Sequence, residues 1–439
     1  MITYRNMYKS ISDFEEIING KNVAVLGVAV SNTPLIEVLA KFGARITAFD
    51  RADAGALADR MERLKPCGIE YRLGPDYLSG LAGFDWIFRT PVIRPDIPEL
   101  VSERIRGAIL TSEMELFLEL CPAKTIGVTG SDGKTTTTTL IYEILKARGY
   151  NCYLGGNIGN PLLQYVGDMT PEDIAVVELS SFQLMTMKKS VDVAVITNLS
   201  PNHLDVHKSY EEYIGAKKNI FMHQAENGYV VLNYDNAETR ALGASAPGRV
   251  GYFTRTDATS LLAYCEAVKP KPAAVYPDSG NNIAYRDAGN AGDVEIVIPA
   301  GDIKIPGAHN IENYMAAICA VRHFVNRSDI ESVARNFNGV EHRIEYIRTF
   351  EGVRYYNDSI ASSPTRTIAC LNTFENKIIL IAGGKDKELD FSTLGKYLHE
   401  KVKLLILCGQ TSEKIRRSLL DYCISRNMPN STPIIDCEN

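Results

Sequence analysis

The stretch from Thr125 to Tyr150, TIGVTGSDGKTTTTTLIYEILKARGY, constrains the fold of this chain more than any other. Its first four residues predict a short strand, and apolar residues at helical spacing from Leu140 to Leu145 predict a helix that Gly149 ends. Two glycines and Lys134 lie between the strand and the helix. Backbone N–H groups, the helix dipole and the lysine charge would therefore meet at one point and favour an anion there.

We interpret this turn as a cradle for the phosphates of ATP. The strict pattern GxxxxGK[ST] is not met, because Val128 stands at the first glycine position, and GxxGxxGKT remains as a tighter variant. The hydroxyl of Thr135 is placed to hold magnesium. The alternative is an ordinary glycine turn, but threonines at 135–139 are poor helix formers and local propensity does not explain them.

Composition limits the class of protein. A chain of 439 residues exceeds what one core usually supports, so two or three domains are expected. The net charge of −6 argues against a sequence-wide nucleic-acid footprint. Nine cysteines without a CxxC pair do not indicate a disulfide framework. Neither a membrane span nor a signal-peptide core is visible, which predicts a cytoplasmic protein.

Upstream of the cradle, residues 21–50 predict the opening of a βαβ unit that ends on Asp50. An acid in this position contacts a ribose or base in nucleotide-binding folds. However, GVAVSN keeps only the first glycine of GxGxxG, and Asp50 could equally be a solvated strand end.

Downstream, two more buried strands end in polar residues. Glu178 follows the apolar run 174–177, where a phosphate-bound magnesium would find a second protein ligand. His203 follows the strand predicted at 193–197 and would lie on the same rim. A single Glu or His is more often structural, but next to a phosphate cradle we favour the metal role.

Two later segments have structural explanations available. Residues 210–223 predict a helix with Lys217 and Lys218 between apolar positions; only one of these lysines can face the rim, and a solvated basic face is the default. Asn310 stands where a helix begins and could be its cap. Residues 255–300, rich in Pro, Gly, Asp and Asn, are expected to form hairpins or loops. The segment 341–439 alternates strand and helix, as in a small doubly wound domain.

Taken together, these motifs resemble the Mur ligases over nearly the whole chain. The matching stretches are GVTGSDGKTT, GGNIG, VELSSFQL, NLSPNHLD, YIGAKKNIF, GAHNIENYMAA, EHRIE, NDSIASS and GGKDKELDF. The resemblance implies an α/β fold of three domains: an N-terminal Rossmann-like domain for the UDP substrate at 1–112, a central P-loop ATPase-type domain at 113–340 and a C-terminal Rossmann-like ligase domain at 341–439. In the family the last domain continues with a strand, a helix and a loop lining the amino-acid site, and the chain ends at Asn439 before them.

The resemblance also assigns roles by position. For catalysis it implies Lys134, Glu178, His203 and Lys217, with Thr135, Glu178, His203 and Lys217 facing two magnesium ions and Lys217 carbamylated. For ATP it implies Gly130, Ser131, Asp132, Gly133, Lys134, Thr135, Thr136, Asn310, Asn313, His342, Arg343 and Asp358. For the other substrates it implies Val30, Ser31, Asp50, Arg51, Asn157, Ser180, Gln183, Ser362 and Lys387.

The activity implied is ATP-dependent addition of D-glutamate to UDP-N-acetylmuramoyl-L-alanine, in peptidoglycan-precursor synthesis, by a monomer with no nucleic-acid partner and no membrane span. ELSSFQL is the most specific motif, since sister ligases that add other amino acids differ there. Two alternatives stay open. One is a Mur-type or folylpolyglutamate-type ligase with another acceptor. The other is a nucleotide-dependent binding or regulatory protein, which would have no use for Lys217 or Lys387 as site residues.

Overall fold

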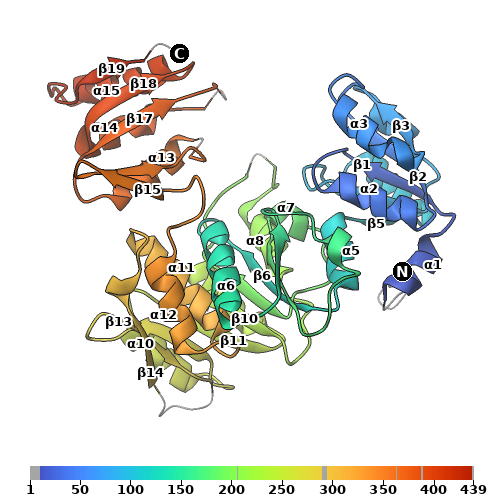
Figure 1. Ribbon diagram of the computed structural model, residues 1–439, viewed down its shortest axis with the longest axis horizontal. Coiled ribbons are helices and arrows are strands. Elements are labelled where there is room, and N and C mark those ends of the chain that lie inside the picture. Colours follow the sequence, from blue (N-terminus) through green and yellow to red (C-terminus); the bar gives the residue numbers. More distant parts are fainter. Residues whose placement is uncertain (1–9, 205, 289–293, 362, 387–388, 438–439) are drawn as a thin grey trace. The chain divides into compact units, whose positions relative to one another are not determined.

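The structure is a computed structural model that describes residues 10–204, 206–288, 294–361, 363–386 and 389–437. It is a mixed α/β fold with several parallel sheets, which confirms the predicted class (Figure 1). The chain forms two compact units: unit 1 comprises Met1–Ala300 and Glu312–Val333, and unit 2 comprises Gly301–Ile311 and Ala334–Asn439. Among the described residues, no helix combines the length and the apolarity needed to cross a membrane.

The first sheet of unit 1 has five parallel strands in the order β3-β2-β1-β4-β5. Its order reverses between β1 and β4, and ligands of open α/β sheets bind outside the carboxyl ends of strands at such a point. The strands are β1 (Asn22–Leu26), β2 (Arg45–Asp50), β3 (Glu70–Leu73), β4 (Trp86–Arg89) and β5 (Ile109–Thr111). The helices are α1 (Ile11–Ile18), α2 (Asn32–Lys41), α3 (Ala58–Leu64) and α4 (Pro98–Arg106).

The second sheet of unit 1 has nine strands in the order β14-β13-β12-β11-β10-β9-β6-β8-β7. The pairs from β7 to β12 are parallel, and β13 and β14 add an antiparallel extension. The strands are β6 (Lys124–Thr129), β7 (Cys152–Gly156), β8 (Ile174–Glu178), β9 (Val193–Ile196), β10 (Tyr229–Asn233), β11 (Arg249–Phe253), β12 (Ala273–Pro277), β13 (Asn282–Arg286) and β14 (Val294–Pro299). The helices are α5 (Glu113–Leu120), α6 (Lys134–Arg148), α7 (Ser181–Leu184), α8 (Tyr210–Lys218), α9 (Ala237–Leu242), α10 (Ala258–Ala267), α11 (Ala308–Val321) and α12 (Arg327–Asn336). The start of α11 (308–311) and the end of α12 (334–336) belong to unit 2.

Three sequence-based predictions for this region need correction. The segment 255–300 contains the helix α10 as well as hairpin strands, because Leu261 and Cys265 bury an apolar face that the polar average of the segment hides. The helix predicted at 210–223 ends at Lys218 and continues as turns. Asn310 is not a cap, because α11 already begins at Ala308.

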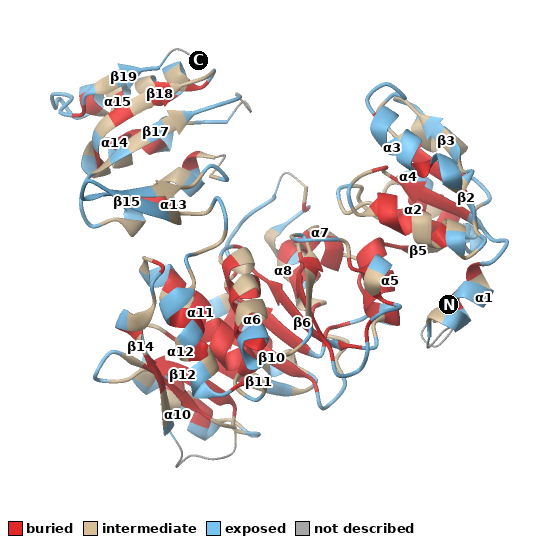
Figure 2. Cartoon of the chain, viewed as in Figure 1, coloured by how far each residue is buried: buried red, intermediate tan, exposed pale blue. Residues whose placement is uncertain are grey.

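Unit 2 carries an antiparallel pair and a parallel sheet in the order β17-β18-β19. Helices and strands bury one shared apolar core, whereas Ile379, Ile381 and Ile435 lie exposed on strands β17 and β19 (Figure 2). The strands are β15 (Glu345–Phe350), β16 (Val353–Asn357), β17 (Ile378–Gly383), β18 (Val402–Cys408) and β19 (Ile434–Asp436), and the helices are α13 (Pro364–Thr373), α14 (Gly395–Lys401) and α15 (Ser412–Ser425). Short 3-10 turns lie at Lys65–Cys67, Tyr77–Gly80, Leu163–Tyr165, Gly243–Ser245, Ala300–Asp302 and Ser392–Leu394.

Candidate active site

The candidate site of unit 1 lies where three neighbouring strands end. Strand β6 pairs with β8 on one side and with β9 on the other, in register Val128↔Glu178 and Thr129↔Ile196. Parallel strands present their carboxyl ends at one edge, so the glycine turn after β6 is flanked by residues that follow β8 and β9. The backbone N–H of Ser131 donates to the carbonyl of Asn198 at 2.9 Å, which holds the turn against the β9 side.

The turn itself requires glycine at two positions. Gly130 has φ +149°, and a Cβ there would lie 1.9 Å from the Thr197 hydroxyl oxygen. Gly133 has φ +78°, and a Cβ there would lie 2.3 Å from the Asn313 amide oxygen. Helix α6 begins at Lys134, directly after Gly133, which has no side chain to cap it. No capping side chain therefore covers the first N–H groups of α6, and anion binding at this helix start stays a prediction.

Lys134 and the threonines of α6 line this turn. The Lys134 ammonium donates to the carbonyl oxygens of Gly130 and Ser131, both at 2.9 Å. The hydroxyls of Thr138 and Thr139 donate to carbonyls one turn earlier, at 2.8 and 2.9 Å. These local bonds explain how residues of poor helix propensity are accommodated.

Lys217 is the buried member of the lysine pair on α8. Its side chain is packed into unit 1, with a residue exposure of 2%, whereas Lys218 is half-buried. The Lys217 amine donates to the Gly130 carbonyl at 2.8 Å and to the Thr129 hydroxyl at 3.1 Å. Burial, reinforced by the charge of Lys134, lowers the pKa of Lys217 well below its ordinary value. The solvated basic face considered from the sequence is therefore wrong for Lys217.

Glu178 offers the clearest position for a cation. The residue is 1% exposed at the end of β8, and its Oε1 accepts a hydrogen bond from the Asn157 amide at 2.8 Å. Its Oε2 is buried and has no hydrogen-bond partner among the residues that the structure describes. An unpaired buried carboxylate oxygen is costly, so a cation at Oε2 would satisfy it.

His203 lies on the same rim but is exposed to solvent. Its backbone has φ +55°, and its ring packs edge-on against Phe182 with centroids 5.2 Å apart. Within the described residues, no three His, Cys, Asp or Glu side chains form a ready-made metal cluster. The residues present fit magnesium, which takes few protein carboxylates and completes its shell with water and substrate phosphates.

Other predicted residues of unit 1 have structural partners. Both oxygens of Asp50 accept backbone N–H groups, from Val28 at 2.7 Å and from Ala52 at 2.9 Å. Val30 and Arg51 are exposed in the loops that follow β1 and β2, and Ser31 precedes α2. A substrate role for these four residues stays a prediction.

Three further predicted residues lie close to Glu178 in the chain or in space. Ser180 and Gln183 form a reciprocal capping box at the start of α7, and Asn157 holds Glu178. Asn313 joins the cradle, since its amide oxygen lies 3.3 Å from the Thr137 hydroxyl as well as above Gly133. The structure thus brings Asn313, which is distant in sequence, to the glycine turn.

Unit 2 carries the remaining predicted residues. The Asn310 amide donates to the Pro306 carbonyl at 2.6 Å. His342, with φ +64°, contacts the Asn357 amide at 2.8 Å through Nδ1. Asp358 accepts the Ile344 N–H at 3.1 Å, and burial raises its pKa. Arg343 is half-buried beside this loop, while Ser362 and Lys387 lie outside the described residues.

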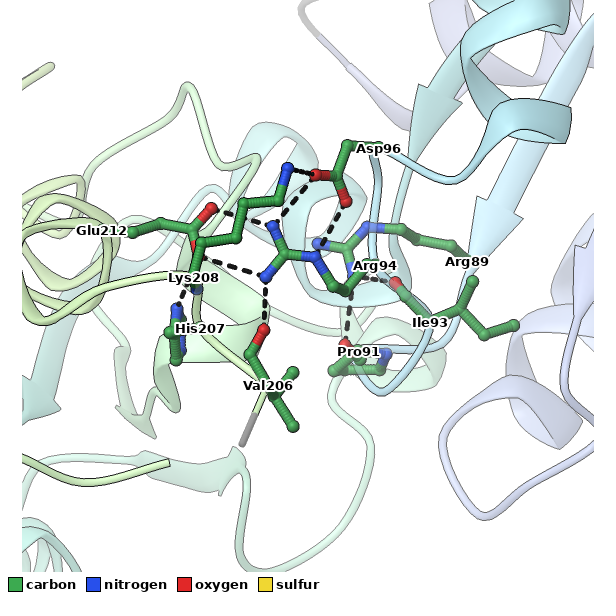
Figure 3. A network of polar contacts seen from close by, with 9 residues as sticks. All are labelled: Arg89, Pro91, Ile93, Arg94, Asp96, Val206, His207, Lys208 and Glu212. Carbon is green, nitrogen blue, oxygen red and sulfur yellow. Dashed lines mark hydrogen bonds and ion pairs between the residues drawn. The ribbon is translucent and has the colours of Figure 1, made fainter. Parts of the chain in front are cut away.

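Sequence reasoning missed a polar network between the two sheets of unit 1 (Figure 3). Arg89, at the end of β4, is fully buried and donates to carbonyls of its own loop and to the Phe182 carbonyl at 3.1 Å. Arg94 in the same loop binds the Glu212 carboxylate on α8. A signal existed in the charged residue that ends the apolar run WIFR, but the partners of Arg89 outside its own loop, Phe182 and Thr186, lie 93 and 97 residues away in the chain.

Comparisons with known proteins place most of this chain in one family. The model for the Mur ligase middle domain matches residues 128–321, and the model for the Mur ligase, glutamate ligase domain matches residues 342–431. The UDP-N-acetylmuramoylalanine--D-glutamate ligase of Ruminiclostridium cellulolyticum is 50% identical over 432 residues, covering 98% of this chain and 90% of that protein. The protein of the same name from Acetivibrio thermocellus is 51% identical over 432 residues, covering 98% and 89%.

Solved structures support the fold. The UDP-N-acetylmuramate-alanine ligase MurC from Thermotoga maritima superposes with a TM-score of 0.56 at 18% identity, covering 95% of this chain and 91% of that one. A structure of MurF from Acinetobacter baumannii gives a TM-score of 0.53 at 16% identity, covering 96% and 88%. At such identities the likeness concerns the fold alone.

Proposed function

Because this chain belongs to the Mur ligase family, we propose that it is an ATP-dependent ligase that joins D-glutamate to UDP-N-acetylmuramoyl-L-alanine in the cytoplasmic synthesis of peptidoglycan precursors. The observation that carries the proposal is the identity of about half of all residues, over nearly the whole chain, with two ligases of that name. The glycine turn with Lys134 and the buried Glu178 supplies a site suited to ATP chemistry.

The reaction proposed has two steps. The alanyl carboxylate of the nucleotide substrate attacks the terminal phosphorus of ATP, so that ADP leaves and an acyl phosphate forms. The D-glutamate amine then attacks the acyl carbon, a C–N bond forms, inorganic phosphate leaves and the amine loses a proton. Lys134 and the N–H groups at the start of α6 would stabilise negative charge on the transferred phosphoryl group.

Thr135, Glu178, His203 and Lys217 are the residues proposed to face two magnesium ions. Bound magnesium would offset the charge of the phosphate oxygens. Glu178 supports this role through its unsatisfied Oε2. Lys217 would do so as a carbamate, formed when its neutral amine attacks CO₂ and releases one proton. Burial favours the neutral amine that this step needs.

The remaining assignments follow from position in the family. The other residues proposed for ATP are Ser131, Asp132, Thr136, Asn310, Asn313, His342, Arg343 and Asp358. Those proposed for the nucleotide substrate and D-glutamate are Val30, Ser31, Asp50, Arg51, Asn157, Ser180, Gln183, Ser362 and Lys387. The domains proposed are 1–112, 113–340 and 341–439, and the protein is proposed to act as a monomer.

Phosphate release from ATP in the presence of UDP-N-acetylmuramoyl-L-alanine tests this function. We expect release to require D-glutamate and to be absent with L-alanine, L-lysine or meso-diaminopimelate. Lys134→Ala should abolish release without loss of the folded state, because this half-buried side chain contributes charge rather than core packing. Preference for another acceptor would contradict the proposed substrate, and ATP binding without any release would indicate a nucleotide-dependent binding protein.

A further inference from the structure

One arginine, in the loop that follows β4 of the five-stranded sheet, is hydrogen-bonded to the segment that carries His203 and to the helix that carries Lys217. Arg94 lies in the loop after β4, and its side chain is only 19% exposed. Its guanidinium donates to both oxygens of Glu212, at 2.8 and 3.1 Å, and to the Val206 carbonyl at 2.5 Å. It also donates to both oxygens of Asp96, at 2.8 and 3.0 Å, which leaves its charge doubly compensated (Figure 3).

The loop that presents Arg94 is itself braced. Arg89 donates through Nη1 to the carbonyls of Pro91 and Ile93, at 3.2 and 3.0 Å. Through Nη2 it donates to the Phe182 carbonyl at 3.1 Å and the Thr186 hydroxyl at 2.9 Å. Planar, delocalised guanidinium groups suit such multiple fixed contacts. The loop that carries Arg94 is therefore held by hydrogen bonds to α7, beside the nine-stranded sheet.

On the other side of the contact, Val206 belongs to the turn that shapes His203. The His203 carbonyl accepts the N–H of Val206 at 3.1 Å and the N–H of His207 at 2.9 Å. His203 itself is held at φ +55°, a conformation that costs a non-glycine residue energy and persists only when its surroundings impose it. The hydrogen bond from Arg94 to the Val206 carbonyl fixes this turn against the loop after β4.

His207 connects the same turn to α7. Its Nε2 lies 2.9 Å from the Ser181 hydroxyl, and its ring stacks on Phe182 with centroids 5.4 Å apart and an interplanar angle of 11°. Phe182 in turn packs against the His203 ring. The side chain of His203 is thus supported by contacts that depend on the turn that Arg94 closes.

Glu212 extends the effect to Lys217. It stands in the first turn of α8, accepts the Lys208 N–H at 2.7 Å and is five residues before Lys217 on one short rigid helix. A displacement of the helix start would be transmitted to the Lys217 amine, which contacts Gly130 at 2.8 Å.

We propose that Arg94 is a positioning residue that orients His203 and Lys217 toward the metal ions. The loop after β4 of the five-stranded sheet would then control the divalent-cation site. This inference rests on the proposed function of that site. It makes a prediction that general destabilisation does not: loss of Arg94 should weaken metal binding while the requirement for D-glutamate stays unchanged.

The test measures Mn²⁺ binding by electron paramagnetic resonance, with a non-hydrolysable ATP analogue, for the unsubstituted protein and for Arg94→Met. Methionine keeps the apolar stem and removes the five donors. We expect the Kd for Mn²⁺ to rise about tenfold in Arg94→Met, and the Mg²⁺ concentration for half-maximal activity to rise in proportion. The KM for D-glutamate should change less than twofold. Arg63→Met is the matched control, because it removes a two-bond Arg–Glu pair, between Arg63 on α3 and Glu37 on α2.

Unchanged Mn²⁺ binding in a folded Arg94→Met protein would overturn the inference. If that variant does not fold, the charge-reversed double variant Arg94→Glu with Glu212→Arg is compared with Arg94→Glu alone. Stronger Mn²⁺ binding in the double variant supports the inference, and equal binding counts against it. A wild-type protein that binds no Mn²⁺ with the ATP analogue would instead refute the proposed function.

Discussion

Two glycine turns followed by lysine, one in each unit, show how sheet position decides what such a turn becomes. The turn after β6 in unit 1 contains Gly130 and Gly133, and the turn after β17 in unit 2 contains Gly383 and Gly384. Strand β6 has neighbours on both sides, whereas β17 is the edge strand of the order β17-β18-β19. Loops from β8 and β9 therefore enclose the first turn, and the second is exposed.

The lysines differ accordingly. Lys134 follows a buried turn whose carbonyls it contacts, and Lys217 is buried behind that turn. Lys385, after the second turn, is exposed. Charges in a water-poor site interact strongly and shift pKa values, whereas exposed charges are screened. The same short pattern thus gives an enclosed charged site after an inner strand and a solvated loop after an edge strand.

The largest effect we expect comes from Lys217→Ala, which should lower turnover by at least about 100-fold, because it removes a group from the enclosed electrostatic site. Lys218→Ala, one residue further along α8, should leave turnover near the wild-type value. Steady-state rates of both variants, measured in bicarbonate-containing buffer, test this difference. The intact mass of the wild-type protein tests for the carbamate. An active Lys217→Ala variant would contradict the proposed role of Lys217, and a fully active wild type without the carbamate mass would contradict its carbamylation.

The next effect concerns the two turns directly. Gly130→Ala should destabilise the protein by several kcal/mol, or rearrange the turn and abolish ATP binding, since a Cβ would lie 1.9 Å from the Thr197 hydroxyl oxygen. Gly384→Ala should cost only the strain of its φ of +133°, about 1–3 kcal/mol, because no described residue other than its chain neighbours has an atom within 4 Å of that Cβ. Urea unfolding and ATP-analogue titration measure both. Similar losses in the two variants would show that enclosure does not distinguish the turns.

A smaller effect tests whether unit 1 buries charge elsewhere. Burial raises the pKa of Glu113 on α5 to about 7, from about 4.5 in the unfolded chain. The folded state then binds the proton more tightly, so stability is full below pH 4.5 and falls as pH rises to 7, by up to about 3 kcal/mol. Glu113→Gln should remove this fall, because glutamine can still accept the Leu163 N–H.

Free energies of unfolding at pH 5 and pH 8 measure this prediction, with Glu119→Gln as the control on the exposed side of α5. We expect wild type and Glu119→Gln to lose stability over that range and Glu113→Gln to lose less. Equal losses in all three proteins would show that Glu113 does not carry a buried charge at pH 8.

The sequence was most informative where a local pattern and an apolar strand coincide. The turn at 130–135 and the strand that ends at Glu178 follow from spacing within a few residues, and the structure places both as predicted. The short strands β3, β5 and β15 were missed, because three to six residues of mixed burial carry little periodicity.

Features that depend on distant contacts could not be read from the chain. Lys217 and Lys218 are equivalent in local sequence, and only packing against the β6 turn buries the first. Asn313 reaches the cradle across 176 residues from Thr137. Arg94 reads as an ordinary surface arginine until its partners on α8 are known. The family resemblance pointed to Lys217 and Asn313, but the contacts that give these positions their roles become visible only in three dimensions.

The contact between Lys217 and Gly130 also bears on the order in which the molecule assembles. These residues are separated by 87 positions, and strands β8 and β9 must take their places on either side of β6 before the contact can form. Contacts of such large sequence separation carry a high loop-closure entropy and form slowly. During synthesis, therefore, the glycine turn emerges from the ribosome long before the residue that closes it from behind, and we expect nucleotide affinity to arise late, after α8 has docked.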